Sequence, residues 1–164
     1  MTKIDLMFDV LTKDECDNII NYCSWKVERS KVLGDSESVI SDWRTSKSLF
    51  IKNWELKEIE KLKNLLVKEY WIKSNQVESF CFLEYDENCE YKPHFDYFNP
   101  NNNNHNSHIK RWWNRIMTFL TYLSNDFEWW CVESIIHFVH RWKYPMNSFL
   151  KEIKYIAKWK EWWA

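Results

Sequence analysis

The chain has 164 residues with 23 basic and 24 acidic side chains, a formal charge of −1. This length suits one domain with a single core, and the charge gives no electrostatic reason to expect nucleic acid or an anionic membrane as a partner. No stretch approaches the about 18 apolar residues of a membrane span, and the N-terminal residues lack the apolar run of a signal peptide. We therefore expect a cytoplasmic protein.

The first half of the chain predicts strands and two helices. Residues 4–10 are typical of a strand, and Thr12-Lys13-Asp14-Glu15 is a capping box that opens a helix. Residues 24–43 are irregular and charged, which predicts a mobile loop over a site. A strand over 45–51 and a helix over 55–70 follow. The apolar face of the first helix consists of Cys16, Ile19, Ile20 and Cys23.

The second half is rich in β-branched and aromatic residues, which favour strands. Strands are predicted over 77–86, 91–98, 115–123, 132–140 and 153–159. Between the second and third of these, residues 99–108 form a polar, low-complexity loop. We interpret its His105 and His108 as solvated. Composition and periodicity alone thus predict an α+β domain.

The segment over residues 85–98 contains the residues best suited to chemistry. His94 and Asp96 are two apart, so on a strand their side chains project from the same face. An imidazole and a carboxylate that converge in this way supply two of the three ligands of a 2-His-1-carboxylate Fe(II) site, which leaves coordination positions open. An ordinary surface pair is the alternative for such a short motif.

The surroundings of this pair resemble the prolyl 4-hydroxylase branch of the 2-oxoglutarate- and Fe(II)-dependent dioxygenases. Two flanking segments, Arg44–Ser48 and Asn114–Leu123, also resemble segments of that family in the same order. The resemblance covers about residues 5–130. It implies a double-stranded β-helix (jelly-roll) supported by N-terminal helices, in one domain over residues 1–164. The C-terminal part of this domain departs from the family pattern, as if strands were lost or the end were truncated. The matching residues of the central segment are Tyr85, Tyr91, Pro93, His94, Asp96, Tyr97 and Phe98.

The resemblance also implies a third metal ligand, a histidine on a later strand. The candidates are His137 and His140, which cannot both face the same side of one strand because they are three apart. His140-Arg141-Trp142 resembles the His-x-Gly of the family if Trp142 stands for glycine. We therefore predict that His94, Asp96 and His140 hold the metal.

The activity implied is hydroxylation of a peptidyl proline or a similar residue, with O2 consumed and succinate and CO2 released. The cofactors implied are Fe(II), 2-oxoglutarate as co-substrate, and ascorbate; the partner is a proline-containing peptide or protein. Tyr85 and Lys154 are predicted to bind 2-oxoglutarate, and Arg44, Tyr91 and Arg115 to line the substrate groove. Each of these residues also has an ordinary alternative, as a strand aromatic, a surface charge or a structural pair.

Two further interpretations stay open: a non-catalytic or truncated relative without a complete metal triad, and an aromatic-rich module that binds peptide or carbohydrate. The second follows from composition, since the chain has 12 Trp and 1 Gly. Trp112-Trp113 and Trp129-Trp130 stand where the family pattern has Gly-Gly. Because turns that need positive φ favour glycine, we hypothesise that such tryptophans are glycines encoded by UGA.

Overall fold

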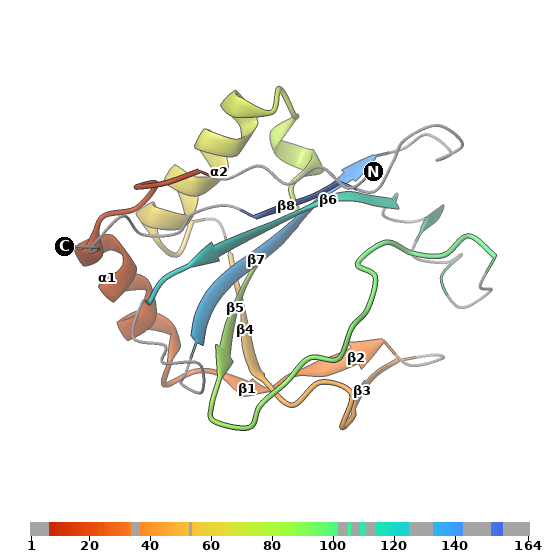
Figure 1. Cartoon of the computed structure of the whole chain (residues 1–164). Coiled ribbons are helices and arrows are strands. Elements are labelled where there is room, and N and C mark those ends of the chain that lie inside the picture. The colour runs from red at the N-terminus through yellow and green to blue at the C-terminus, as the bar shows by residue number, and fades with distance from the viewer. Residues whose placement is uncertain are drawn as a thin grey trace.

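The computed structural model describes residues 7–33, 37–52, 54–101, 105, 109–110, 114–124, 133–142 and 152–155. For residue 116 and the last two ranges the description covers the backbone only. Within this part of the chain, two helices, one short 3-10 helix and eight strands are present (Figure 1). None of these helices is long and apolar enough to cross a bilayer.

The helices are α1 (Lys13–Cys23), α2 (Lys57–Glu69) and the 3-10 turn η1 (Ser74–Gln76). The strands are β1 (Glu28–Arg29), β2 (Lys31–Leu33), β3 (Ser38–Ile40), β4 (Lys47–Ile51), β5 (Phe80–Tyr85), β6 (Asn114–Tyr122), β7 (Glu133–Trp142) and β8 (Glu152–Tyr155). Six of them form one sheet in the order β1-β4-β5-β7-β6-β8, while β2 and β3 form a separate antiparallel hairpin. Within the large sheet only the β6–β8 pairing is parallel among the pairs described.

Helix α1 begins at the predicted capping box. The Thr12 side chain accepts a hydrogen bond from the Glu15 amide at 3.2 Å, and the Glu15 carboxylate accepts one from the Thr12 amide at 2.8 Å. Such reciprocal bonds satisfy two amides that the first helical turn leaves without partners. Lys61 of α2 lies 2.7 Å from the same carboxylate. The cap thus also links the two helices.

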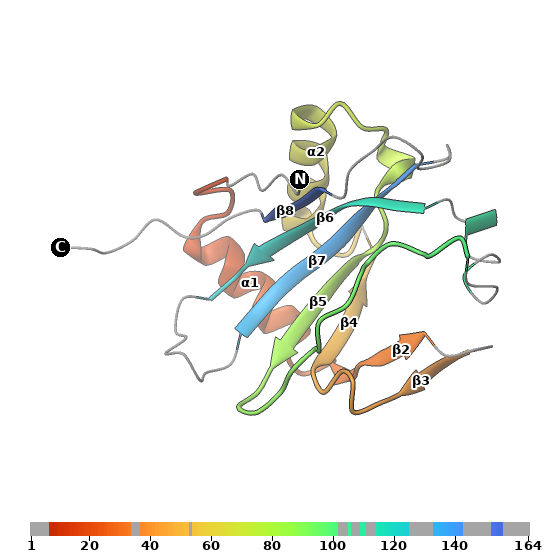
Figure 2. The ribbon, with the colours of Figure 1, turned by 45° about the vertical axis from the view of Figure 1, so that its right-hand side comes forward.

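Both helices cover the same face of the large sheet, as Figures 1 and 2 show. The core between them is apolar and includes Ile19, Ile59, Phe80, Phe82 and Phe119, all fully buried. Fully burying each side chain of this size stabilises the fold by roughly 1.5–3 kcal/mol. The opposite face faces the β2–β3 hairpin and the segment between β5 and β6 (Figure 2).

We call this second face the open face. Side chains alternate between the two faces along a strand. The residues of β5 and β6 whose side chains do not enter the core under the helices therefore lie on the open face. Cys81, Leu83, Tyr85, Leu120 and Tyr122 pack together there. The open face is therefore the surface of the sheet on which a site can be built.

The α+β prediction is confirmed, and among the described residues the sheet does not close into a barrel. The jelly-roll stays a prediction. The irregular loop predicted over 24–43 is wrong in part, because these residues contribute β1, β2 and β3. For the strand predicted over 4–10, residues 4–6 lie outside the described part, and 7–10 contain only an isolated bridge position, at Phe8.

The strand predicted over 91–98 is wrong. Its described backbone contains a single bridge, between Arg44 and Tyr91, followed by bends. Pro93 explains the break, because proline has no amide hydrogen to donate to a ladder and is confined to edges and bulges. The argument that His94 and Asp96 share one face of a strand therefore does not hold, and their placement has to come from other contacts.

The four cysteines described are free thiols, and three of them are buried. Cys16, Cys23 and Cys81 are buried, whereas Cys89 is half-buried. Burial raises the pKa of Cys23 to about 12 and that of Cys81 to about 11. Since the thiolate is the reactive form, these two side chains serve packing.

The tryptophans whose side chains are described do not pack the core. Trp25, Trp43, Trp54 and Trp71 are all exposed, and Trp71 is 94% exposed. Trp71 also has φ +54° and directly follows Tyr70, the C-terminal cap of α2. This is the position at which helices most often place a left-handed glycine. The positive φ of Trp71 favours the glycine hypothesis at this position. Trp112, Trp113, Trp129 and Trp130 lie outside the described residues.

We predict that Trp71→Gly raises the free energy of unfolding by about 0.5–1 kcal/mol, because glycine adopts positive φ without strain. Urea denaturation measures the change. Trp54→Gly is the matched control: Trp54 is 80% exposed and is not among the described positive-φ residues. Equal effects of the two substitutions would show that position 71 has no special need for glycine.

Candidate metal and substrate site

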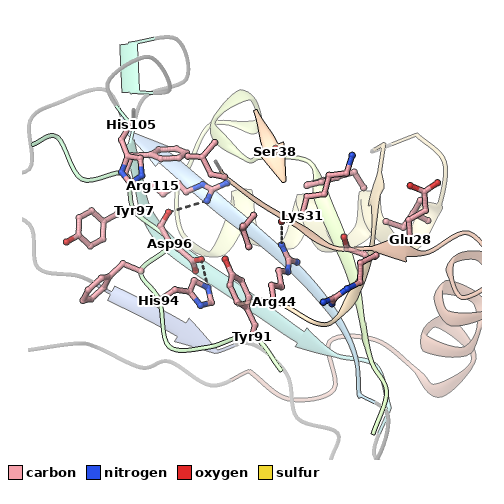
Figure 3. Close-up of a pocket in the computed structure, with 18 of the residues that line it drawn as sticks. Glu28, Lys31, Ser38, Arg44, Tyr91, His94, Asp96, Tyr97, His105 and Arg115 are labelled. Atoms are coloured by element: carbon pink, nitrogen blue, oxygen red, sulfur yellow. Dashed lines mark hydrogen bonds and ion pairs between the residues drawn. The ribbon is translucent and has the colours of Figure 1, made fainter. Parts of the chain in front are cut away.

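A cleft of about 690 Å³ lies on the open-face side of the molecule (Figure 3). Strands β1, β2 and β4 contribute one wall, and the segment 91–98 contributes another. A volume of this size falls in the range of small-molecule and cofactor sites. The side chains used below that line it are Arg29, Lys31, Arg44, Tyr91, His94, Asp96, His105 and Arg115.

The histidine and aspartate of the sequence motif meet in this cleft. His94 Nε2 lies 3.4 Å from Asp96 Oδ1, and both side chains are about one-third exposed or less. His94 Nδ1 lies 2.8 Å from the Lys92 carbonyl oxygen. Since a carbonyl only accepts, Nδ1 carries a hydrogen. Nε2 faces Asp96: in the protonated ring it donates to the carboxylate, and in the neutral ring its lone pair is the one that a metal ion would take. This is the tautomer that a metal ligand needs.

The second carboxylate oxygen of Asp96 is held by the sheet. Thr118 Oγ1 donates to Asp96 Oδ2 at 2.6 Å, which fixes Asp96 against β6. Arg115 Nη1 donates to the Asp96 backbone carbonyl at 3.2 Å. The guanidinium of Arg115 in turn forms a two-point ion pair with Glu78, at 2.9 and 3.0 Å. The sheet therefore positions Asp96 through both its backbone and its side chain.

The ring of His94 is held by stacking. The Tyr91 and His94 ring centroids lie 3.5 Å apart with the planes 18° from parallel, and the Arg44 guanidinium lies 4.8 Å from the Tyr91 centroid. Desolvation alone would lower the pKa of His94, but its hydrogen bonds to Asp96 and to the Lys92 carbonyl raise the pKa above its ordinary value. A metal ion at Nε2 would replace the proton that this raised pKa favours.

The chemistry of the two donors fits Fe(II). One nitrogen and one carboxylate oxygen face each other, and the remaining donor atom of each side chain is already engaged, as is typical of metal ligands. Among the residues whose side chains are described, no set of three or more His, Cys, Asp or Glu could hold a metal ion. The described part of the site thus supplies two candidate ligands.

Strand β7 carries both candidates for a third ligand, and their side chains lie outside what the structure describes. In the strand register, His140 is opposite Met117, which packs against the helix-side core. His137 is opposite both Cys81 and Leu120, which belong to the open face. Directly paired residues of antiparallel strands share a face. The register position of His137 is therefore an open-face position, while His140 stays a prediction.

The other predicted residues divide between the cleft and its surroundings. Arg44, Tyr91 and Arg115 line the cleft together with His94 and Asp96, which we call the metal pair after their predicted role. Tyr85 instead packs on the open face with Cys81 and Leu83, outside the residues that line this cleft. The side chain of Lys154 lies outside the description; its backbone on β8 pairs with Phe119.

The interpretation of His105 as a solvated residue holds only in part, because the side chain is half-buried and makes two contacts. Its Nδ1 accepts a hydrogen bond from the Asn99 amide at 2.9 Å, and its ring contacts Phe98 edge-on, with 5.7 Å between centroids. His105 lines the cleft at the end opposite Lys31 (Figure 3). His108 lies outside the described residues.

Comparison with known proteins shows what the whole chain is similar to. Probable prolyl 4-hydroxylase 7 of Arabidopsis thaliana is 32% identical over 117 residues, which are 70% of this chain and 35% of the relative. This chain is prolyl 4-hydroxylase-like. Probable prolyl 4-hydroxylase 6 of the same plant is 30% identical over 118 residues, which are 70% of this chain and 39% of the relative. Prolyl 4-hydroxylase 1 is 28% identical over 130 residues, which are 77% of this chain and 44% of the relative.

The prolyl 4-hydroxylase-like chain spans between about one-third and one-half of the length of these relatives. No family model matches it. Probable prolyl 4-hydroxylases 10 and 3 of the same plant are 31% and 30% identical to this chain over 117 and 118 residues. The activity of this chain itself is accordingly a matter for proposal and experiment.

Two residues that support the site were missed by the sequence reasoning. Thr118 holds Asp96, and Glu78 pairs with Arg115. The Arg-x-x-Thr spacing of residues 115–118 offered a signal for Thr118, because it was one of the matched segments. Glu78 carried no signal, since an acidic residue before a strand is commonplace on a protein surface.

Proposed function

We propose that this chain catalyses Fe(II)- and 2-oxoglutarate-dependent hydroxylation of a proline, or a similar residue, in a peptide or protein. The observation that carries the proposal is the opposed pair of donors, His94 Nε2 and Asp96 Oδ1, 3.4 Å apart in a cleft of about 690 Å³. The family likeness supplies the reaction class. A double-stranded β-helix is the fold that we propose for the complete domain.

His94 and Asp96 would hold Fe(II), and the third ligand would come from β7. When bound, the iron would supply oxygen activation at the expense of 2-oxoglutarate, with succinate and CO2 as co-products and ascorbate as the reductant that maintains Fe(II). Thr118 and Arg115 hold Asp96, and Tyr91 holds the plane of His94. These contacts set the direction of the two ligand atoms before a metal arrives.

The remaining predicted roles are part of the proposal. Tyr85 and Lys154 would bind the carboxylates of 2-oxoglutarate, for which a tyrosine hydroxyl and an ammonium are suitable partners. Arg44, Tyr91 and Arg115 would contact the peptide, and all three line the cleft. His140 is the predicted third ligand by its motif, and His137 is the alternative by its register position.

The test is turnover of a proline-rich peptide with Fe(II), 2-oxoglutarate and O2. We expect succinate to form in step with a peptide product heavier by one oxygen atom, and both to stop when iron is chelated. Succinate that forms without iron, or a peptide left unmodified while no succinate appears, would contradict the proposal and favour a non-catalytic relative.

The same assay identifies the third ligand. His137→Ala and His140→Ala are compared, and we expect one of them to lose more than about 100-fold in turnover, because even the outer residues around a metal ligand contribute 10–100-fold. The other serves as the matched control on the same strand. If both variants keep the wild-type rate, the third ligand is not a histidine of β7.

A further inference from the structure

The cleft is unbalanced in charge. Two carboxylates, Glu28 and Asp96, face five cationic side chains. Two of the five are engaged elsewhere, because Arg115 pairs with Glu78 and Lys26 lies 3.0 Å above the Tyr22 ring. The other three are Arg29, Lys31 and Arg44, which we call the basic arm.

Neutral groups hold the two arginines of the basic arm in place. Arg29 donates to the backbone carbonyls of Ser41 and Ser46 at 3.4 and 3.5 Å. Arg44 donates to the Lys31 carbonyl and the Ser46 hydroxyl, both at 3.3 Å. None of the ion pairs found within the described part of the chain involves these three cations. Neutral acceptors fix a guanidinium without cancelling its charge, so the arm presents a positive field to the cleft.

The basic arm lies at a defined distance from the metal pair. Tyr91 is sandwiched between Arg44 and His94, with 4.8 Å on one side and 3.5 Å on the other. Figure 3 shows Arg44 beyond Tyr91 as seen from His94, where the Arg44 guanidinium bonds the backbone carbonyl of Lys31. An extended peptide advances about 3.3 Å per residue. If one residue of a peptide lies at the metal, the residue about two positions along the peptide would therefore have its side chain beside the basic arm.

We propose that the cleft selects peptides with an aspartate or glutamate about two positions from the residue to be hydroxylated. The inference rests on the proposed function, because it takes the cleft as the peptide site. A carboxylate would form charge-assisted hydrogen bonds with Arg44 and an ion pair with Lys31. Glu28, on the neighbouring strand β1, would repel it and so bias it toward Lys31 and Arg44.

The test is binding of fluorescent proline-containing peptides to the full chain, measured by anisotropy in the absence of O2. Matched peptides carry Glu, Gln or Lys two positions before the proline, and a second set carries them two positions after it. In one of the two sets we expect the Glu peptide to bind about tenfold more tightly than the Gln peptide. The advantage should shrink as salt is added, because the arm is solvent-exposed in part.

Lys31→Glu is the decisive variant. Lys31 is exposed, so the reversed charge leaves the fold intact. We expect the preference to change from the Glu to the Lys peptide, whereas Lys57→Glu on α2, outside the cleft lining, leaves it unchanged. Arg44→Gln should reduce the preference as well. Equal affinity for Glu and Gln peptides, or a preference that survives Lys31→Glu, overturns the inference.

Two further outcomes separate this inference from the proposed function. A Glu preference that depends on Lys31, in a chain that hydroxylates no peptide, supports the basic arm and contradicts the enzyme. Turnover of peptides without any preference for an acidic residue supports the enzyme and contradicts the role of the basic arm. If Lys31→Glu weakens 2-oxoglutarate and not the peptides, the arm binds the co-substrate and the inference fails. Absence of binding by every peptide overturns the inference too.

Discussion

Replacing His94 or Asp96 by alanine is expected to abolish iron binding in the cleft and to reduce 2-oxoglutarate turnover by more than about 100-fold. Each substitution removes one of two opposed donor atoms that lie 3.4 Å apart. With the partner donor alone, the described part of the site would hold a metal by a single ligand. Iron content after gel filtration and succinate release measure the two effects.

Lys92→Ala is the matched control for this prediction. Its side chain is half-exposed and lies 3.7 Å from Glu90, while its backbone carbonyl, which orients His94, survives the substitution. We expect wild-type iron content from this variant. Circular dichroism checks that all three variants keep their secondary structure. Wild-type succinate release by His94→Ala or Asp96→Ala would refute the metal assignment.

Glu78→Ala is expected to lower the free energy of unfolding by about 3 kcal/mol, because it leaves the Arg115 cation without its counter-charge in a largely enclosed position. The pair is well formed, with two contacts of 2.9 and 3.0 Å, and the Glu78 side chain is only 10% exposed. Because Arg115 also holds the Asp96 carbonyl, iron affinity should fall in the same variant. Urea denaturation and an iron titration measure these changes.

The control is an ion pair of similar length on the surface. Lys13 and Asp17 are 2.6 Å apart at i and i+4 of α1, with 73% and 46% of their side chains exposed. Exposed pairs of this kind contribute about 0.3–0.5 kcal/mol, so Asp17→Ala should change stability little. Equal losses from Glu78→Ala and Asp17→Ala would show that Arg115 is not enclosed as described.

Local rules were sufficient for the helices and for most strands. The capping box at Thr12 located the start of α1, and apolar spacing located α2, because both signals depend on neighbours within a few residues. The β2–β3 hairpin was not predicted. Five of its six strand residues are exposed, so buried and exposed side chains do not alternate along it. A hairpin without a buried face leaves little periodic signal in the sequence.

The sequence identified the metal pair from an expected strand that the structure does not contain. His94 and Asp96 were expected to converge as alternate residues of a strand, but Pro93 interrupts the ladder. Local contacts with the Lys92 carbonyl and the Tyr91 ring fix His94, whereas a tertiary contact with Thr118 fixes Asp96. Contacts between residues 22 positions apart, such as that of Thr118 with Asp96, cannot be read from local spacing.

The most direct test of the metal and co-substrate site is anaerobic addition of Fe(II) and 2-oxoglutarate, followed by visible absorption. Chelation of Fe(II) by the keto acid in a protein site gives a charge-transfer band, and we expect it to saturate at one iron per chain in the wild type. Asp96→Ala should show no band under the same conditions. A wild-type chain that is folded by circular dichroism, yet binds no iron and gives no band, would contradict the assignment of this cleft as a dioxygenase site.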